Sequence, residues 1–346
     1  MGLGTYRLIL AYLVVCSHLG INLDDPSGVN IGVQVGVAAV VCFYALSGFV
    51  MAALVERHFP TIEAAGNFYL DRALRILPQF WFYLVIALAA FAFNLIPTVG
   101  FVSSCTLGNI VANFLVFPFH FLWVNDLAGC LLVPPAWSLG VEVMFYAAVP
   151  FIFVFRLRGA AMVASIAVFV LAYLGVIDTG YHGYRAITGT MFIFLCGSYL
   201  FTRQNRTERV IPWVIFAGAL IGLAGTLQFP SSNVLYTRSV LVGVAVAVPA
   251  LFVLGFRRTG KWDAFAGHVS YGVFLNHFVV IWALAGFGLA RGERFMLVAI
   301  FGTAASIISF LLVERPIQMI RRSLRTRKEA AAIVATPPGA QAAASA

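Results

Sequence analysis

The sequence predicts an all-α integral membrane protein of about ten transmembrane helices, with an external or re-entrant segment between the third and the fourth. Hydrophobic residues make up 62% of the 346 residues and charged residues only 10%, whereas soluble domains carry about 25% charge. Apolar stretches of about 17–25 residues recur along the chain, and the basic residues lie between them. These observations exclude a soluble globular domain.

Ten apolar stretches have the length of a membrane span. They lie near residues 4–22, 33–54, 77–96, 136–155, 160–177, 186–202, 210–228, 236–255, 264–287 and 295–314. With the N-terminus in the cytoplasm, eighteen of the 22 lysines and arginines fall on the cytoplasmic side and four fall outside. The positive-inside rule predicts this asymmetry, so we expect both termini to be cytoplasmic.

The segment 97–135 contains an apolar stretch, residues 109–123, that could form an eleventh span. Counting it as a crossing reverses the asymmetry to eight basic residues inside and fourteen outside. We therefore expect 97–135 to be external or re-entrant. Cys105 and Cys130 both fall in it; two unpaired thiols are the favoured interpretation, and a disulfide in an oxidising compartment is the alternative.

We expect one polytopic membrane domain over residues 1–325 and a disordered cytoplasmic tail over 326–346, where small residues and a Pro-Pro pair cannot build a core. The net charge of +9 does not predict a nucleic-acid partner, because the basic residues punctuate apolar spans instead of forming a patch. No histidine, cysteine or acidic cluster has metal-ligand spacing, so we expect no metal.

Arg7 and His18 stand out in the first apolar stretch. Eleven residues turn an α-helix by roughly 1100°, so the two side chains fall within about 20° of one face and about 16 Å apart along the axis. A charged side chain at mid-bilayer costs about 2.5–3.5 kcal/mol on insertion scales and usually marks a functional path. We therefore expect this helix to carry part of a functional site.

Glu142 is another ionisable group predicted at depth, about 8 Å into the fourth span. Tyr146 lies one turn further on the same face and can hydrogen-bond into the same cavity. An unpaired carboxylate at this depth becomes neutral or finds a cation. Glu142 therefore either belongs to the site or serves as a structural partner.

Arg72 and Arg75 lie one turn apart at the cytoplasmic end of the third span, and we expect Pro78 to break the helix just beyond them. Snorkelling at a membrane interface explains many such arginines. Two guanidinium groups on one face also form a clamp for phosphate. The spacing leaves interfacial anchoring and anion binding both open.

The ninth span places Ser270 and His277 seven residues apart, hence on one face. A single histidine in a span is either a satisfied structural group or a site residue. Ser270 is better explained as a packing hydroxyl than as a nucleophile, because no Gly-x-Ser-x-Gly element surrounds it.

Six short elements occur together along the chain. They are an Arg-x10-His pair (Arg7, His18), a Ser-Gly-Phe turn (Ser47, Gly48, Phe49), Arg-x-x-Arg-Ile-x-Pro (Arg72, Arg75, Ile76, Pro78), Trp-Ser-Leu-x-x-Glu-x-x-Phe-Tyr (Trp137, Ser138, Leu139, Glu142, Phe145, Tyr146), Ser-Tyr-x-x-Phe-Leu-x-His (Ser270, Tyr271, Phe274, Leu275, His277) and Glu-x-Pro (Glu314, Pro316). In these elements, and in their order, the chain resembles the membrane acyltransferase-3 family, whose members O-acylate sugars and other acceptors with an acyl-CoA donor. One position departs: the family's frequent aspartate is Val41 here, so the role of that carboxylate is either absent or supplied by Asp24 or Asp25.

The resemblance implies a stand-alone O-acyltransferase of the bacterial inner membrane. It would move an acetyl or other short acyl group from acyl-CoA to a hydroxyl of a cell-surface or exported carbohydrate or glycolipid, with lipopolysaccharide and exopolysaccharide among the candidates. Acetyl-CoA is the expected donor, and the bilayer the expected surroundings. The rival class is a proton-coupled transporter or exporter, which also places histidine, arginine and glutamate in spans. That class predicts inverted repeats with broken helices, and the sequence shows no such halves.

On this hypothesis His18 is the general base that takes a proton from the acceptor hydroxyl. Arg7 positions the donor or polarises its carbonyl, and Glu142 orients either His18 or the acceptor. Arg72 and Arg75 hold the phosphates of CoA. The expected donor site is completed by Ser47, Tyr146 and His277. Direct transfer and a relay through a covalent intermediate on His18 fit equally well.

Overall fold

The computed structural model describes residues 1–21, 32–96, 101–122, 126–228, 234–321 and 323. Over these residues the fold is helical, and its one backbone bridge, between Val102 and Cys130, belongs to no strand. The predicted tail over 326–346 and the candidate carboxylates Asp24 and Asp25 lie outside the described residues.

Ten helices of 16 to 28 residues form the described fold, and each overlaps one predicted span. They are α1 (Leu3–His18), α2 (Val35–His58), α3 (Ala65–Ala92), α5 (Trp137–Val154), α6 (Arg158–Tyr173), α7 (Ile187–Thr202), α8 (Arg206–Gln228), α9 (Val234–Leu254), α10 (Lys261–Ala283) and α11 (Arg291–Ser309). Among the described residues, seven helices are long and apolar enough to cross a membrane. Because α1, α6 and α7 are shorter, the all-helical membrane fold is confirmed, and the count of ten crossings stays a prediction.

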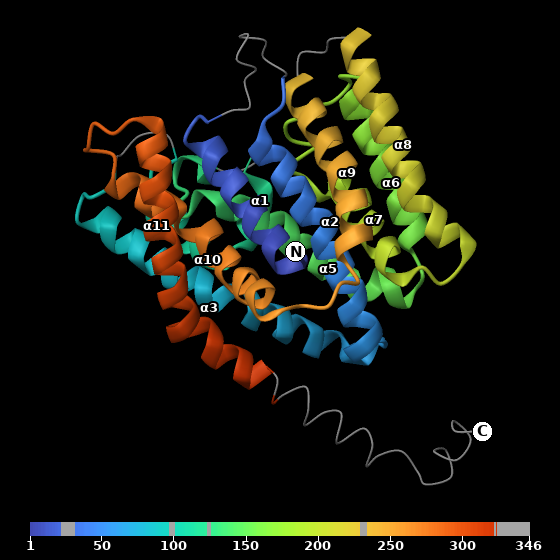
Figure 1. The fold of residues 1–346 in the computed structure, drawn as a ribbon, viewed down its shortest axis with the longest axis horizontal. Helices are drawn as coiled ribbons and strands as arrows, with labels where there is room; N and C mark the ends of the chain where they lie inside the picture. Colours follow the sequence, from blue (N-terminus) through green and yellow to red (C-terminus); the bar gives the residue numbers. More distant parts are fainter. Residues whose placement is uncertain (22–31, 97–100, 123–125, 229–233, 322, 324–346) are drawn as a thin grey trace.

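Helices α1 and α2 lie near the centre of the bundle in Figure 1, with α3 and α11 on one side and α6 and α8 on the other. Helix α2 packs against α7, α9 and α1, and α1 packs against α10. Helix α2 is accordingly buried along most of its length. Helices α1 and α2, which carry Arg7, His18 and Ser47, therefore form the middle of the fold.

The N-terminus of α1 is fastened to α10 by the carboxylate of Asp263. This carboxylate accepts hydrogen bonds from the backbone of Gly2 at 3.0 Å, and from the backbone and hydroxyl of Thr5 at 2.9 and 2.8 Å. The first N–H groups of a helix lack partners within it, and the helix dipole favours a negative charge there. A Cβ at Gly4 would collide with the carbonyl of Asp263, so glycine permits this close approach. The contact fixes α1 against α10.

The Ser-Gly-Phe element is not a turn, as the sequence predicted, but part of the uninterrupted helix α2. Gly48 lets the backbone of α7 approach, because a Cβ there would collide with the carbonyl of Phe194. Ser47, beside it, faces the cavity described below. The glycine therefore serves close helix packing.

The prediction that Pro78 breaks the helix is also wrong, because α3 continues through it from Ala65 to Ala92. Proline removes one backbone hydrogen bond, which membrane helices tolerate where neighbouring groups compensate. Since α3 begins twelve residues before the predicted span, Arg72 and Arg75 lie inside the helix and not at its end.

The segment 97–135 folds, in its described part, as the nine-residue helix α4 (Leu107–Leu115) and three short 3-10 helices. None of these could cross a membrane as a helix. Cys105 and Cys130 form a disulfide, so the favoured interpretation of two unpaired thiols is wrong. The bridge at Val102 and the buried Asn113, whose amide donates to the carbonyl of Cys130 at 2.8 Å, hold these two stretches together. A re-entrant path for the segment remains a prediction.

Candidate functional site

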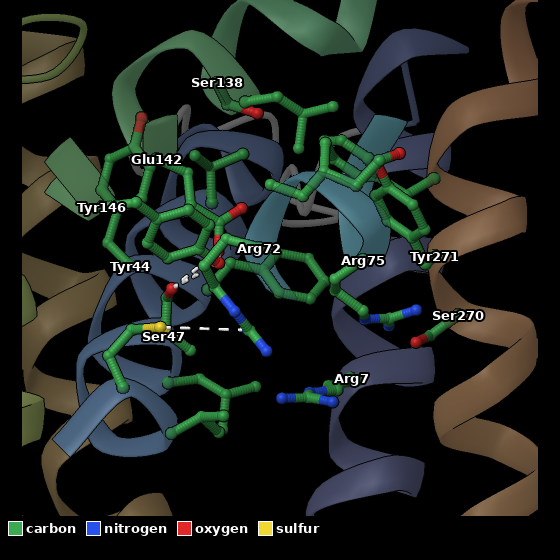
Figure 2. Close-up of a pocket in the computed structure, with 18 of the residues that line it drawn as sticks. Arg7, Tyr44, Ser47, Arg72, Arg75, Ser138, Glu142, Tyr146, Ser270 and Tyr271 are labelled. Atoms are coloured by element: carbon green, nitrogen blue, oxygen red, sulfur yellow. Dashed lines mark hydrogen bonds between the residues drawn. The ribbon is translucent and has the colours of Figure 1, made fainter. Parts of the chain in front are cut away.

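The first cavity, which we call the arginine cavity, has a volume of about 330 Å³. Its polar lining includes Arg7, Arg72, Arg75, Arg321, Glu142 and Tyr271. These side chains come from α1, α3, α5, α10 and the helical turn after α11, and Figure 2 shows the guanidinium groups of Arg7, Arg72 and Arg75 gathered in one space. Because Ser47 also lines this cavity, the structure brings together residues from five of the six sequence elements.

Glu142 forms a hydrogen-bonded cluster with Ser47 and Tyr146 on one wall of this cavity (Figure 2). Ser47 donates to Oε1 of Glu142 at 2.6 Å, and the hydroxyl of Tyr146 donates to the same oxygen at 2.5 Å. Both bonds go to one oxygen, and no described residue hydrogen-bonds to Oε2. The second oxygen can therefore accept from a ligand.

Arg72 and Arg75 do not form a clamp of two free cations, because each has a carboxylate partner. Arg72 is paired with Asp71, which also binds Arg321 at 3.1 Å. Arg75 is paired with Glu314 and lies 5.2 Å from the ring centroid of Tyr271. Glu314, the partner of Arg75, is the last residue of a short π-helix over residues 310–314. The arginines are thus held in place while still lining the cavity.

Arg7 is different, because no hydrogen bond or ion pair joins it to any residue that the structure describes. Its guanidinium group extends into the arginine cavity, in the same space as those of Arg72 and Arg75 (Figure 2). Like charges in one cavity are costly unless an anion compensates them. The arrangement therefore favours an anionic ligand between them.

Tyr44 adds a polar group that the sequence did not single out. Its side chain lines the arginine cavity and is only 3% exposed, yet its hydroxyl has no hydrogen-bond partner among the described residues. Buried hydroxyls are nearly always paired, so an unpaired one at a cavity wall indicates a bond made by a ligand or by water.

The second cavity, the histidine cavity, has a volume of about 650 Å³ and is lined by His18, Gln34, Trp137, Tyr184, Arg185 and Tyr236, among others. The two cavities share three lining residues, Val40, Ser138 and Phe274. They are therefore neighbours separated at this point by little more than these side chains.

His18 and His277 form a pair at the edge of the histidine cavity. Nδ1 of His18 and Nε2 of His277 are 2.9 Å apart, and Nδ1 of His277 is 3.3 Å from the carbonyl of Val273. A carbonyl can only accept, so Nδ1 of His277 donates to it; in a neutral ring Nε2 must then accept from Nδ1 of His18. This series of hydrogen bonds leaves Nε2 of His18 with a free lone pair. His277 is fully buried, whereas His18 is exposed to the cavity.

The structure does not bring Glu142 and His18 together. They line different cavities, Glu142 is bonded to Ser47 and Tyr146, and His18 is bonded to His277. In this arrangement Glu142 makes no contact that could orient His18, and the partner of His18 is the ring of His277. His277 lines neither cavity, so its expected contact with the donor is not part of this arrangement.

Comparison with known proteins decides the family. A family model described as an acyltransferase domain matches residues 3–315. The chain belongs to the acyltransferase-3 family. It is a membrane acyltransferase, and all six sequence elements fall at least in part within the matched region.

Three relatives are similar to this acyltransferase. An uncharacterised protein of Aquifex aeolicus (strain VF5) is 31% identical over 200 residues, which cover 56% of this chain and 90% of the relative. The exopolysaccharide production protein ExoZ of Rhizobium meliloti (strain 1021) is 26% identical, covering 85% and 92%. Nodulation protein 10 of Rhizobium leguminosarum bv. viciae is 24% identical, covering 93% and 94%. No solved structure matches the chain.

Sequence reasoning missed several residues of this acyltransferase. Asp71 and Arg321, which fix Arg72, give no signal beyond their charge. Glu314 belongs to the Glu-x-Pro element, which could have indicated that it pairs with a site residue such as Arg75. Arg185 was placed only as one of four external cations, although its aromatic neighbours Tyr181 and Tyr184 are visible in the sequence.

Among the described residues of this acyltransferase, no group of three or more histidine, cysteine, aspartate or glutamate side chains could hold a metal ion. The polar groups of the two cavities are instead arginines, tyrosines and a histidine pair. Such groups bind phosphate and hydroxyl groups and move protons.

Proposed function

We propose that this membrane enzyme moves an acetyl or other short acyl group from acyl-CoA to a hydroxyl of a cell-surface or exported carbohydrate. The donor enters the arginine cavity from the cytoplasm, and the acceptor occupies the histidine cavity, which opens toward the outside of a bacterial inner membrane. The printed name of the relative ExoZ refers to exopolysaccharide production, which supports this class of acceptor. One membrane domain over residues 1–325 suffices for this scheme.

The charges of the arginine cavity support its assignment as the binding site of the acyl-CoA donor. Among the described residues, four arginines line it, and three carboxylates line it or pair with these arginines, namely Asp71, Glu142 and Glu314. Phosphate groups match guanidinium forks, and a positive cavity attracts a polyanion such as CoA. The pantetheine arm would then pass the shared wall at Val40, Ser138 and Phe274, so that the thioester reaches His18.

The observation that carries the proposal is the hydrogen-bonded chain from Val273 through His277 to His18. It leaves Nε2 of His18 as an acceptor facing the histidine cavity. The acceptor hydroxyl would give its proton to this nitrogen as its oxygen attacks the thioester carbonyl carbon. The carbon–sulfur bond then breaks, and the CoA thiolate leaves and takes up a proton.

The direct test uses purified protein, acetyl-CoA labelled in the acetyl group, and polysaccharide from the source cell. Transfer of label to the polysaccharide, with free CoA produced in equal amount, is the expected result. Label that stays on CoA in the presence of every acceptor offered contradicts the proposal.

Replacing Arg7 with glutamine is expected to raise the apparent KM for acetyl-CoA about 10- to 100-fold, which is the loss of one charge-assisted hydrogen bond of about 1.5–3 kcal/mol. Arg7 is the most informative cation to remove, because its loss leaves no described carboxylate without a partner. Initial rates at varied donor concentration measure the effect. The same rates are then measured with acetyl-dephospho-CoA, which lacks the 3′-phosphate. If Arg7 contacts this phosphate, the wild type and Arg7→Gln should have the same KM for this donor.

Arg158→Gln is the matched control for Arg7→Gln. Arg158 pairs with Glu208 at 2.6 Å and lines neither cavity, so its replacement removes one positive charge elsewhere in the fold. The control should keep the wild-type KM. An unchanged KM in Arg7→Gln, or an equal rise in both variants, contradicts phosphate binding by Arg7.

Replacing Tyr44 with phenylalanine removes one unpaired hydroxyl and leaves the ring in place against Phe194, 4.7 Å away. If the hydroxyl donates to the bound donor, kcat/KM for acetyl-CoA should fall about 5- to 10-fold, as for a neutral hydrogen bond of about 1–1.5 kcal/mol. The control is Tyr6→Phe, which removes another buried tyrosine hydroxyl from a side chain that lines neither cavity. Equal rates in all three proteins would remove Tyr44 from the site.

A further inference from the structure

The histidine cavity has an aromatic wall built from three separate parts of the chain. Trp137 begins α5, Tyr184 lies in the connection before α7, and Tyr236 lies in α9. The rings of Trp137 and Tyr184 are 5.0 Å apart between centroids, and those of Tyr184 and Tyr236 are 5.8 Å apart and inclined at 30°. Aromatic faces of this kind offer an apolar surface with polar edges, which suits a ring that has both C–H and O–H groups.

Arg185 lies within this wall, and its guanidinium carbon is 4.9 to 5.4 Å from the centroids of the three rings. It donates one hydrogen bond to the carbonyl of Gly180 at 2.7 Å and one to the hydroxyl of Tyr236 at 3.0 Å. A guanidinium group has five N–H donors, so these two bonds orient it and leave donors for a ligand.

Within the part of the cavity that the structure describes, no carboxylate balances the charge of Arg185. Among the described residues that line the histidine cavity there is no aspartate or glutamate, and Arg185 is its one arginine or lysine. Burial raises the pKa of the Tyr184 hydroxyl, which keeps it neutral as a hydrogen-bond donor. The cavity therefore presents a positive potential and neutral donors, in contrast to the arginine cavity, where carboxylates accompany the cations.

We propose that the histidine cavity is a binding site for an acidic sugar, whose carboxylate is held by Arg185 while the sugar ring lies on the wall of Trp137, Tyr184 and Tyr236. The inference rests on the proposed function, because it assigns the acceptor to the cavity that His18 also lines. The cavity volume of about 650 Å³ falls within the range of about 300–1,000 Å³ typical of ligand sites.

The site fixes the orientation of the acceptor as well as its class. A carboxylate bound to Arg185 and a hydroxyl presented to His18 are two points on one ligand, so the charged group selects which hydroxyl reaches the base. An acceptor without the carboxylate would leave the guanidinium group desolvated and unpaired, which disfavours it.

The test compares two sugars that differ only in the carboxylate, methyl β-D-glucopyranosiduronic acid and methyl β-D-glucopyranoside. Binding to the purified wild-type protein in detergent is measured by saturation-transfer NMR and calorimetry. We expect the uronate to bind at least tenfold more tightly than the neutral sugar. In Arg185→Gln the two sugars should bind with about equal affinity, because the uronate binds more weakly while the affinity for the neutral sugar is unchanged. Arg185→Lys should retain part of the preference for the uronate.

Arg238→Gln is the matched control, since Arg238 binds Thr226 and does not line the cavity. It should keep the wild-type preference. Equal binding of the two sugars to the wild type, no binding of either, or an equal loss of both in Arg185→Gln would overturn the inference; the last result would make Arg185 a structural support of the aromatic wall.

A parallel titration with acetyl-CoA separates this inference from the proposed function. If acetyl-CoA binds and the sugar preference is absent, the acidic-sugar site is wrong and the acyltransferase scheme stands. If the preference is present but acetyl-CoA does not bind, the sugar site stands and the donor scheme is wrong.

Discussion

Replacing His18 with alanine is expected to lower the rate of acyl transfer about 10²- to 10⁴-fold, with little change in the KM for acetyl-CoA. The imidazole presents a free Nε2 to the histidine cavity, and no other histidine among the described residues lines either cavity. Without it, the acceptor hydroxyl has no base of suitable strength within reach. The measurement is single-turnover transfer to the acceptor, together with acetyl-CoA binding to confirm that the donor site is intact.

The control for His18→Ala is His120→Ala. His120 is a buried imidazole in the connection between α3 and α5 and lines neither cavity. Full activity of His18→Ala at normal expression would exclude the base role.

Mass spectrometry of the wild type incubated with labelled acetyl-CoA and no acceptor distinguishes direct transfer from a relay through His18. Only the relay leaves an acetyl group on the peptide that contains His18.

The helical architecture could be predicted because it depends on local apolar length, and each of the ten predicted spans overlaps a helix. Errors arose where tertiary contacts decide the local structure. Pro78 was expected to break a helix that packing keeps continuous, and Gly48 was interpreted as a turn although it serves the contact with α7. The disulfide between Cys105 and Cys130 depends on a backbone bridge that no spacing rule reveals.

The sequence indicates which polar side chains lie within the helical bundle, but not how they are arranged. Helical spacing placed Arg7 and His18 on one face, and the structure puts them in two neighbouring cavities along α1. Which partner each residue takes depends on helix packing. Glu142 meets Ser47 and not His18, and His18 meets His277, because α1 packs extensively against α10 and hardly contacts α5.

Replacing His277 with leucine is expected to lower kcat about 10- to 100-fold and to leave the KM for acetyl-CoA unchanged, as for other groups that orient a functional histidine. His277 touches neither cavity, so it acts through His18. Its loss removes the acceptor that holds the proton on Nδ1 of His18, and the ring can then present the wrong tautomer or turn away from the acceptor. Steady-state kinetics with the donor and the acceptor varied separately measures this split.

Glutamine at position 277 distinguishes positioning from packing. Its side-chain oxygen can accept the hydrogen bond from Nδ1 of His18, which lies 2.9 Å from Nε2 of the native ring. His277→Gln should therefore recover most of the activity lost in His277→Leu, and its pH profile should follow that of the wild type. A glutamine variant as slow as the leucine variant, with both proteins folded and binding acetyl-CoA normally, would mean that His277 does not act by accepting this proton, and the assignment of Nε2 of His18 as the free base would fail with it.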